Sequence, residues 1–229
     1  MPEHTDRHFE LELQNLQELI LRMGGLVEAQ ISRAIDSLVE RDSEQAREVI
    51  AGDREVNQLD IAIDELCLKL LALHQPAAGD LRFITTGLKI TTDLERIGDQ
   101  AVNVCERALE LNEEPQLKPY IDVPRLAAEA TTMVRESLDA FVRRDTQLAS
   151  NVCLEDDVVD ALYEQIFREL LSYMAENPRT ITRATRILFV AKYLERIADH
   201  ATNIAEMVIF MVNGKMIRHA QKLPPTNGS

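Results

Sequence analysis

The sequence of 229 residues contains no tryptophan, and its few aromatic residues make up only 4% of the chain. Glycine and proline are also scarce, with 8 of each. Sheets prefer β-branched and aromatic side chains, and folds rich in tight turns need glycine and proline. Because hydrophobic residues still make up 45% of the chain, the composition favours helices packed through aliphatic side chains.

The chain also lacks features of secreted and membrane proteins. Its three cysteines, Cys67, Cys105 and Cys153, are odd in number, far apart and flanked by aliphatic residues. They are typical of buried thiols in a reducing cytoplasm, not of disulfides or a zinc site. The sequence has no run of about eighteen apolar residues that could span a membrane, and its start lacks the pattern of a secretion signal. We therefore expect a cytoplasmic protein.

The chain also has fewer basic than acidic residues, 25 against 39. The formal net charge is −14, and the basic residues are scattered among acidic ones. A surface of this kind repels phosphate backbones, so we expect no binding of nucleic acid.

Apolar residues recur in steps of three and four along three long segments, at about 6–40, 43–74 and 76–112. This spacing predicts long amphipathic helices. Pro76 is expected to begin the third, because the first helical position needs no N–H. Gly24 and Gly25 lie inside the first and are expected to allow a close approach by another backbone or a slight bend.

The pattern then restarts after a proline-rich segment. Arg41 and Asp42 recur as Arg144 and Asp145, an offset of 103 that falls to 100 after the next loop. The sequence thus predicts an all-α fold of two tandem three-helix bundles, related by internal duplication and a pseudo-twofold axis, with six long antiparallel helices. The predicted parts are a first bundle at 6–112, a linker at 113–124, a second bundle at 125–215 and a flexible tail at 216–229.

The clearest repeat is a decamer, LERIGDQAVN at 94–103 and LERIADHATN at 194–203, with seven of ten positions identical. On a helical wheel its acidic residues lie opposite the apolar stripe, so we expect them on an exposed outer face. In each copy the preceding helix contributes further polar residues, which lie outside its own apolar stripe. The candidates are Glu95, Asp99, Asp53, Asn57, Asp60 and Asp64 in the first copy and Glu195, Asp199, Asp156 and Asp160 in the second.

Carboxylates spaced four apart on one helix face repel each other, and a multivalent cation reverses the sign of that interaction. These residues therefore suit an exposed metal site with oxygen ligands, although a solvated acidic face would show the same pattern. Arg96 and Arg196 could instead pair with nearby acids and join helix to helix, which is compatible with metal binding. His200 is expected to point to solvent or to a neighbouring helix.

The two decamers, the loop HQPAAGDLR and the segment MGGLVEAQI together resemble the PhoU family over residues 8–215. The resemblance implies two three-helix bundles with surface metal clusters on E(D)-x-x-x-D motifs. These motifs fall on Glu95 with Asp99, Glu195 with Asp199, and Asp156 with Asp160. Asp53 is followed by Asn57, whose amide brings no charge, so weaker binding is implied there. Iron, manganese, zinc and magnesium are all compatible with these ligands.

The resemblance also implies a function. PhoU proteins are negative regulators of the phosphate-starvation response that link the ATPase subunit of a phosphate ABC transporter to a membrane sensor histidine kinase. The protein would then be a non-enzymatic adaptor and a homodimer, reaching the membrane only through its partners. Arg96 and Arg196 are candidates for partner contacts. Two alternatives are a carboxylate-bridged metalloenzyme, although the chain has no E-x-x-H motif, and a purely structural dimeric helical bundle.

Overall fold

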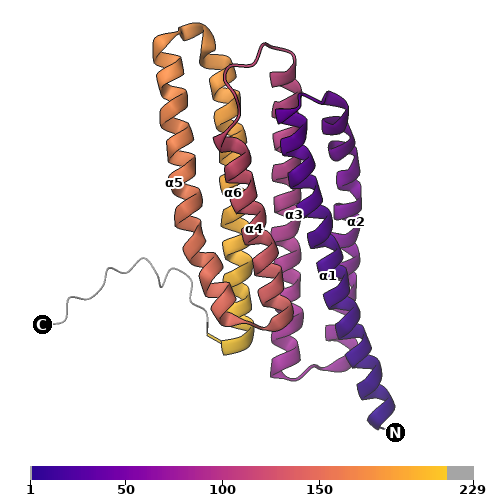
Figure 1. Cartoon of the computed structure of the whole chain (residues 1–229). Helices are drawn as coiled ribbons and strands as arrows, with labels where there is room; N and C mark the ends of the chain where they lie inside the picture. Colours follow the sequence, from indigo (N-terminus) through magenta and orange to yellow (C-terminus); the bar gives the residue numbers. More distant parts are fainter. Residues whose placement is uncertain (1, 216–229) are drawn as a thin grey trace, which may run out of the picture.

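The computed structural model describes the backbone of residues 2–215 and side chains from residue 7 onward. In this range the chain forms no strand, and its elements are one short 3₁₀ helix, η1, and six long α-helices (Figure 1). Their bounds are α1 Pro2–Val39, α2 Ser43–His74, α3 Ala78–Asn112, α4 Asp122–Arg143, α5 Thr146–Glu176, η1 Pro178–Thr180 and α6 Ile181–Asn213. The predicted all-α fold of two tandem three-helix bundles is confirmed. The predicted tail at 216–229 lies outside the described residues.

The two bundles lie side by side. Helices α1, α2 and α3 pack against one another, and so do α4, α5 and α6. Between the bundles α3 packs along α6, and α1 packs along α4, while α2 and α5 form opposite outer edges of the molecule (Figure 1). No helix in the described part of the chain is long and apolar enough to cross a membrane.

Two helix starts differ from the expected positions. Pro76 lies in the connection before α3, because Gln75 has a left-handed backbone and Ala77 an extended one. Helix α4 begins at Asp122, inside the segment predicted as a linker. Pro124 therefore lies in the first turn of α4, where its missing N–H leaves no helical hydrogen bond unmade.

The repeated Arg-Asp pair makes the same turn in both bundles. Arg41 and Arg144 both have left-handed backbones, with φ of 59° and 52°. The next residue, Asp42 or Asp145, accepts hydrogen bonds from two backbone N–H groups in the first turn of the following helix, at 2.9–3.0 Å. Such N-caps satisfy donors that have no partner within the helix. The duplication thus preserves a helix end and a helix start.

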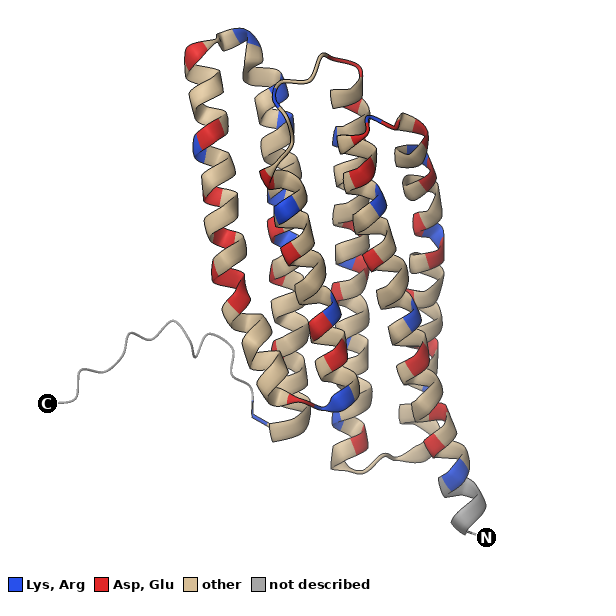
Figure 2. Cartoon of the chain, viewed as in Figure 1, with Lys and Arg blue, Asp and Glu red and all other residues tan. Residues whose placement is uncertain are grey.

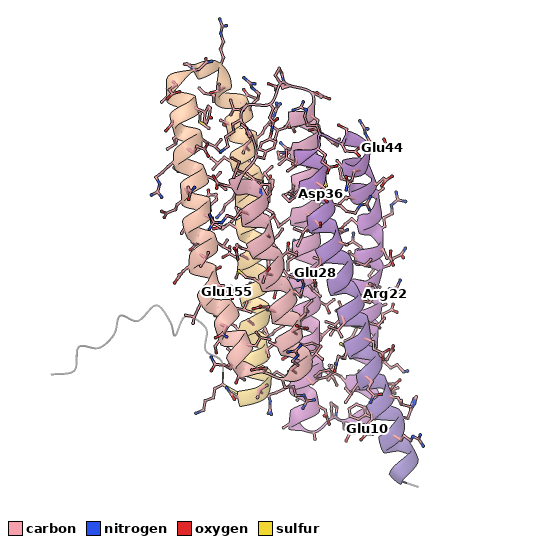
Figure 3. The ribbon with its side chains drawn as sticks, viewed as in Figure 1. Glu10, Arg22, Glu28, Asp36, Glu44 and Glu155 are labelled. Carbon is pink, nitrogen blue, oxygen red and sulfur yellow. The ribbon has the colours of Figure 1, made fainter. Side chains whose placement is uncertain are left out.

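Ion pairs and hydrogen bonds connect the bundles. Arg186 of α6 pairs with Glu110 of α3, with 2.7 Å between Nε and Oε2. Between α1 and α4, Arg135 of α4 donates from Nε to Oε2 of Glu28 at 3.1 Å. Glu28 is labelled on α1 in Figure 3. Nδ1 of His200 lies 2.8 Å from Oδ1 of Asp93 on α3, so His200 does contact a neighbouring helix.

Gly24 lies on α1 where that helix packs closely against Leu138 of α4. A Cβ atom built on Gly24 would clash with Cδ1 of Leu138 on α4, whereas one on Gly25 would meet nothing within 4 Å. The expected close approach is present, but the neighbour is a leucine side chain and not a backbone.

These two glycines give a matched test of the bundle interface. Alanine favours a helix over glycine by about 1 kcal/mol at either position, but at Gly24 it also overpacks Leu138, which costs about 1–3 kcal/mol. We expect Gly25→Ala to stabilise the protein and Gly24→Ala to be less stable than Gly25→Ala, as measured by urea denaturation. Equal stabilisation by both substitutions would contradict the close packing.

Candidate functional site

The acidic residues of the first copy gather along the groove between α2 and α3. We call Asp53, Asn57 and Asp60 of α2 with Glu95 and Asp99 of α3 the first acidic cluster. Asn57 donates from Nδ2 to Oδ2 of Asp53 at 2.9 Å. Arg96 lies beside the α3 acids, with 3.4 Å from its Nε to Oε2 of Glu95 and 3.6 Å from its Nη1 to Oδ2 of Asp99.

The charges of the first cluster act on one another across the groove. Partial burial and the charge of Asp99 raise the pKa of Glu95, with further contributions from Asp60 and Asp53 that Arg96 opposes. Partial burial and the charge of Asp53 likewise raise the pKa of Asp99. The two helices therefore bring mutually repelling carboxylates together, as a site for a cation would require.

The second copy forms an equivalent group between α5 and α6. Asp156 and Asp160 of α5 with Glu195 and Asp199 of α6 make up the second acidic cluster. Partial burial and the charges of Asp160 and Asp199 raise the pKa of Asp156 to about 6. Here the cluster contains a cation of its own, because Nζ of Lys192 lies 2.6 Å from both Oε1 and Oε2 of Glu195.

The structure confirms the expected exposure of some of these residues and corrects it for others. Exposed side chains are those of Asn57, Asp64, Asp160 and Asp199. The wheel also placed the remaining candidates on an outer face, but they lie half-buried at the seam between two helices, and they are Asp53, Asp60, Glu95, Asp99, Asp156 and Glu195. The side chain of Glu195 is only 13% exposed and that of Glu95 26%. The neighbouring helix α5 or α2 covers part of the face that a single helix viewed alone presents to water. The outer acids of α2 and α5 are visible along the two edges of the molecule (Figure 2).

Two contributors were not found from the sequence. One is Gln30 of α1, which donates from Nε2 to Oδ1 of Asp53 at 3.4 Å and whose Oε1 is buried without a hydrogen-bond partner. The glycine in LERIGD was a signal for it. A Cβ on Gly98 would lie 3.2 Å from Oδ1 of Asp53 and 3.3 Å from Oε1 of Gln30. The second decamer has Ala198 at this position. The other missed residue is Lys192, which lies just before the repeated decamer.

The donor set of each cluster suits a hard divalent cation, which prefers carboxylate and amide oxygens. The unpartnered oxygen of Gln30 gives the first cluster an additional neutral ligand. In the described part of the chain, no three side chains of His, Cys, Asp or Glu are placed to hold one ion. Binding would therefore need the acidic side chains to rotate toward one another, with Glu95, Asp99 and Asp53 as candidate ligands in the first copy.

Fold and site together define a class: a duplicated helical-bundle protein with a carboxylate-lined groove in each copy. Comparison with known proteins identifies the family. The family model described as PhoU domain matches residues 20–108 and again 123–208. The chain belongs to the PhoU family.

Relatives and solved structures agree with this assignment over nearly the whole chain. The chain is 44% identical over 217 residues to the phosphate-specific transport system accessory protein PhoU homolog of Pseudomonas aeruginosa, covering 94% of this chain and 90% of that protein. It is 39% identical over 216 residues to the phosphate-specific transport system accessory protein PhoU of Escherichia coli (strain K12), again covering 94% and 90%.

Two crystal structures have the same fold. The structure of PhoU from Pseudomonas aeruginosa superposes with a TM-score of 0.87 at 45% identity, covering 90% of this chain and all of that one. The phosphate transport system regulatory protein PhoU from Streptococcus pneumoniae superposes with a TM-score of 0.85 at 30% identity, covering 91% and 98%.

The raised pKa of Asp156 predicts how stability depends on pH when metal is absent. The carboxyl has an ordinary pKa of 3.8 and a folded-state pKa of about 6, so between these values the folded state binds more protons than the unfolded state. This group therefore makes stability fall as pH rises from about 4 to 6. Asp156→Asn should stabilise the metal-free protein at pH 7 by about 1–2 kcal/mol after screening is allowed for, and should not stabilise it at pH 4.

The measurement is urea denaturation in chelator at both pH values. Glu164→Gln is the matched control, since Glu164 lies on the same helix, is 70% exposed and pairs only loosely with Arg168 at 3.7 Å. It should change stability by less than about 0.5 kcal/mol. An equal effect of Asp156→Asn at pH 4 and pH 7 would contradict the raised pKa.

Proposed function

We propose that this protein is a cytoplasmic negative regulator of the phosphate-starvation response, which helps control phosphate uptake. In this role it connects the ATPase subunit of a phosphate ABC transporter with a sensor histidine kinase. The supporting observation is the family match to both copies, together with relatives named as accessory proteins of the phosphate-specific transport system that align with 94% of the chain.

The mechanism proposed is docking without catalysis. The two bundles present long helix faces, and the ion pairs between α3 and α6 and between α1 and α4 hold these faces in one arrangement. One face would contact the transporter subunit and another the kinase, keeping the kinase in its non-signalling state. We further propose that the protein acts as a homodimer.

A metalloenzyme is the less favourable interpretation, because of where the acidic residues lie. Carboxylate-bridged enzymes of helical bundles direct their ligands into the core between helices. Here the inward positions of the two decamer helices are aliphatic, with Leu94, Ile97, Leu194 and Ile197 completely buried. The carboxylates lie at the outer grooves, where they suit surface ions better than a shielded reaction centre.

We propose that these grooves bind divalent metal ions, with iron, manganese, zinc and magnesium as candidates. The metal ligands would be Glu95, Asp99, Asp53 and Asn57 in the first copy, and Glu195, Asp199, Asp156 and Asp160 in the second. A divalent cation relieves the repulsion that raises the pKa values of Glu95 and Asp99. Its contribution in this proposal is to shape and neutralise the surface on which partners dock.

Deletion of the gene tests the regulatory role. A strain without it should show high alkaline phosphatase activity in medium rich in phosphate, because the kinase is no longer held in its non-signalling state. The intact gene supplied on a plasmid should restore low activity. Unchanged low activity in the deletion strain, with the protein confirmed as absent, would contradict the proposal.

The two arginines of the decamers provide a test of docking. Arg96 and Arg196 are both exposed, so Arg96→Ser with Arg196→Ser should leave the fold intact. If they contact partners, alkaline phosphatase activity in high phosphate should rise toward the deletion level, while circular dichroism and the amount of protein stay normal. The exposed pair Arg47→Ser and Arg143→Ser serves as the control for loss of charge. If the folded double variant still kept alkaline phosphatase activity low, Arg96 and Arg196 would not be part of the docking surface.

A further inference from the structure

The two acidic clusters have the same number of carboxylates but different surroundings. The first has Asp53, Asp60, Glu95 and Asp99, and the second has Asp156, Asp160, Glu195 and Asp199. The charge lost at Asn57 is therefore replaced by Asp60, whose charge reaches Glu95. A difference in metal binding between the copies must come from what lies around the carboxylates.

In the second cluster a lysine side chain lies beside the carboxylates. The ammonium of Lys192 lies 2.6 Å from both carboxylate oxygens of Glu195. It also lies 5.4 Å from the ring centroid of Tyr163 on α5, so that it spans the groove between the two helices. Glu195 is only 13% exposed, which distinguishes this pair from the exposed ion pairs that contribute little. The ammonium donates a hydrogen bond to Oε1 and forms an ion pair with Oε2, and these are the oxygens that a divalent ion would coordinate.

In the first cluster the equivalent position holds no cation. Thr92 corresponds to Lys192, and its hydroxyl donates to the carbonyl of Leu88 on its own helix at 3.1 Å. Asp60 corresponds to Tyr163, so a carboxylate lies where the second copy has the ring under the lysine. The first copy thus has neither the lysine nor the aromatic ring that accompanies it.

Arg96 does not take the place of that cation. Its side chain is 57% exposed, and its nitrogens lie 3.4 Å and 3.6 Å from the nearest oxygens of Glu95 and Asp99. Charge-assisted hydrogen bonds are shorter, at about 2.7–2.9 Å. The guanidinium therefore lies at the rim and leaves the carboxylates available.

A third difference is on the helix behind each groove. The first cluster adjoins Gln30, which is 8% exposed and has a buried amide oxygen without a partner beside Asp53. The corresponding residue of the second copy is Met133, a buried apolar side chain. The first cluster therefore has a neutral amide oxygen available to a cation, whereas the buried oxygen without a hydrogen-bond partner in the second cluster is Oε2 of Glu195 itself.

We propose that Lys192 is the resident cation of the second acidic cluster, where it takes the place of a divalent metal ion, and that the first cluster is the principal metal site of this chain. The proposal rests on the metal binding proposed above and assigns it to one of the two copies. A metal ion can enter the second cluster only by displacing the ammonium from Glu195. Lys192 thus determines which half of the duplicated molecule responds to metal.

A reciprocal exchange of the two corresponding residues tests this assignment. The full chain is stripped with chelator and titrated with Mn²⁺ by isothermal calorimetry, and the bound metal is counted after equilibrium dialysis. Lys192→Thr should add bound Mn²⁺, with affinity at the second cluster raised roughly tenfold or more because a competing charge is gone. Thr92→Lys should weaken Mn²⁺ binding by a similar factor. Lys89→Thr, which removes a lysine that contacts the ring of Phe210, should leave binding unchanged.

Stability in the absence of metal is an independent readout. In chelator, Lys192→Thr should lower Tm by about 2–8 °C relative to Lys89→Thr, because the largely buried carboxylate of Glu195 loses its ion pair with the lysine. Mn²⁺ should then raise Tm of Lys192→Thr more than that of the wild type. Circular dichroism verifies that the variants are folded.

The outcomes separate this proposal from the function on which it rests. Wild-type binding of Mn²⁺ that neither exchange alters would overturn the assignment and leave metal binding intact. The assignment would also be overturned if Glu195→Gln abolished Mn²⁺ binding and Glu95→Gln did not. Absence of Mn²⁺ binding in the wild type and in Lys192→Thr would overturn metal binding itself, whereas the alkaline phosphatase test of regulation would be unaffected.

Discussion

The antiparallel packing of α3 along α6 is the interaction on which the rest of the molecule depends. Each of these helices is covered by three others, α3 by α1, α2 and α6, and α6 by α3, α4 and α5. A helix surrounded in this way presents only a narrow strip to water, so many of its polar residues lie at the seams between neighbours. Asp93 lies at the seam with α6 and bonds to His200, while the decamer carboxylates lie at the seams with α2 and α5. The shape of the bundle thus sets the partial burial of the acids.

Half-buried carboxylates are costly unless a cation accompanies them. The two copies meet this requirement in different ways. In the second copy Lys192 pairs directly with Glu195. The residue of α4 that corresponds to Gln30 is Met133, which is buried and apolar. In the first copy only an arginine at the rim is present, and the amide of Gln30 reaches Asp53 from α1. Duplication kept Asp53, Glu95 and Asp99 as Asp156, Glu195 and Asp199 while their surroundings diverged, and this divergence is the basis for the proposal that the two copies differ in their response to ions.

The same duplication kept the parts of the sequence that define helix ends. Arg41 with Asp42 and Arg144 with Asp145 make equivalent turns, because a left-handed residue followed by an N-capping aspartate ends one helix and starts the next. Between the bundles the contacts are not repeated in this way. Arg186 pairs with both Glu110 and Glu114, and Arg135 pairs with Glu28, so that these contacts connect one half to the other. These connections fit the docking role proposed above, since the two halves keep a fixed relation while each presents its own surface.

The sequence by itself determined the helical class, the two copies, the apolar stripes and the carboxylate motifs, because these depend on periodicities that can be counted along one chain. It predicted that Glu95, Asp99, Glu195 and Asp199 lie off the stripe, which they do. The sequence could not determine how exposed these side chains are, because a helical wheel represents one helix alone. Which neighbouring helix covers part of that surface is determined by the packing. For the same reason Gln30 and Lys192 were missed. Gln30 reaches Asp53 from a helix some twenty residues away in sequence, and only the packing of α5 against α6 places the ring of Tyr163 under Lys192.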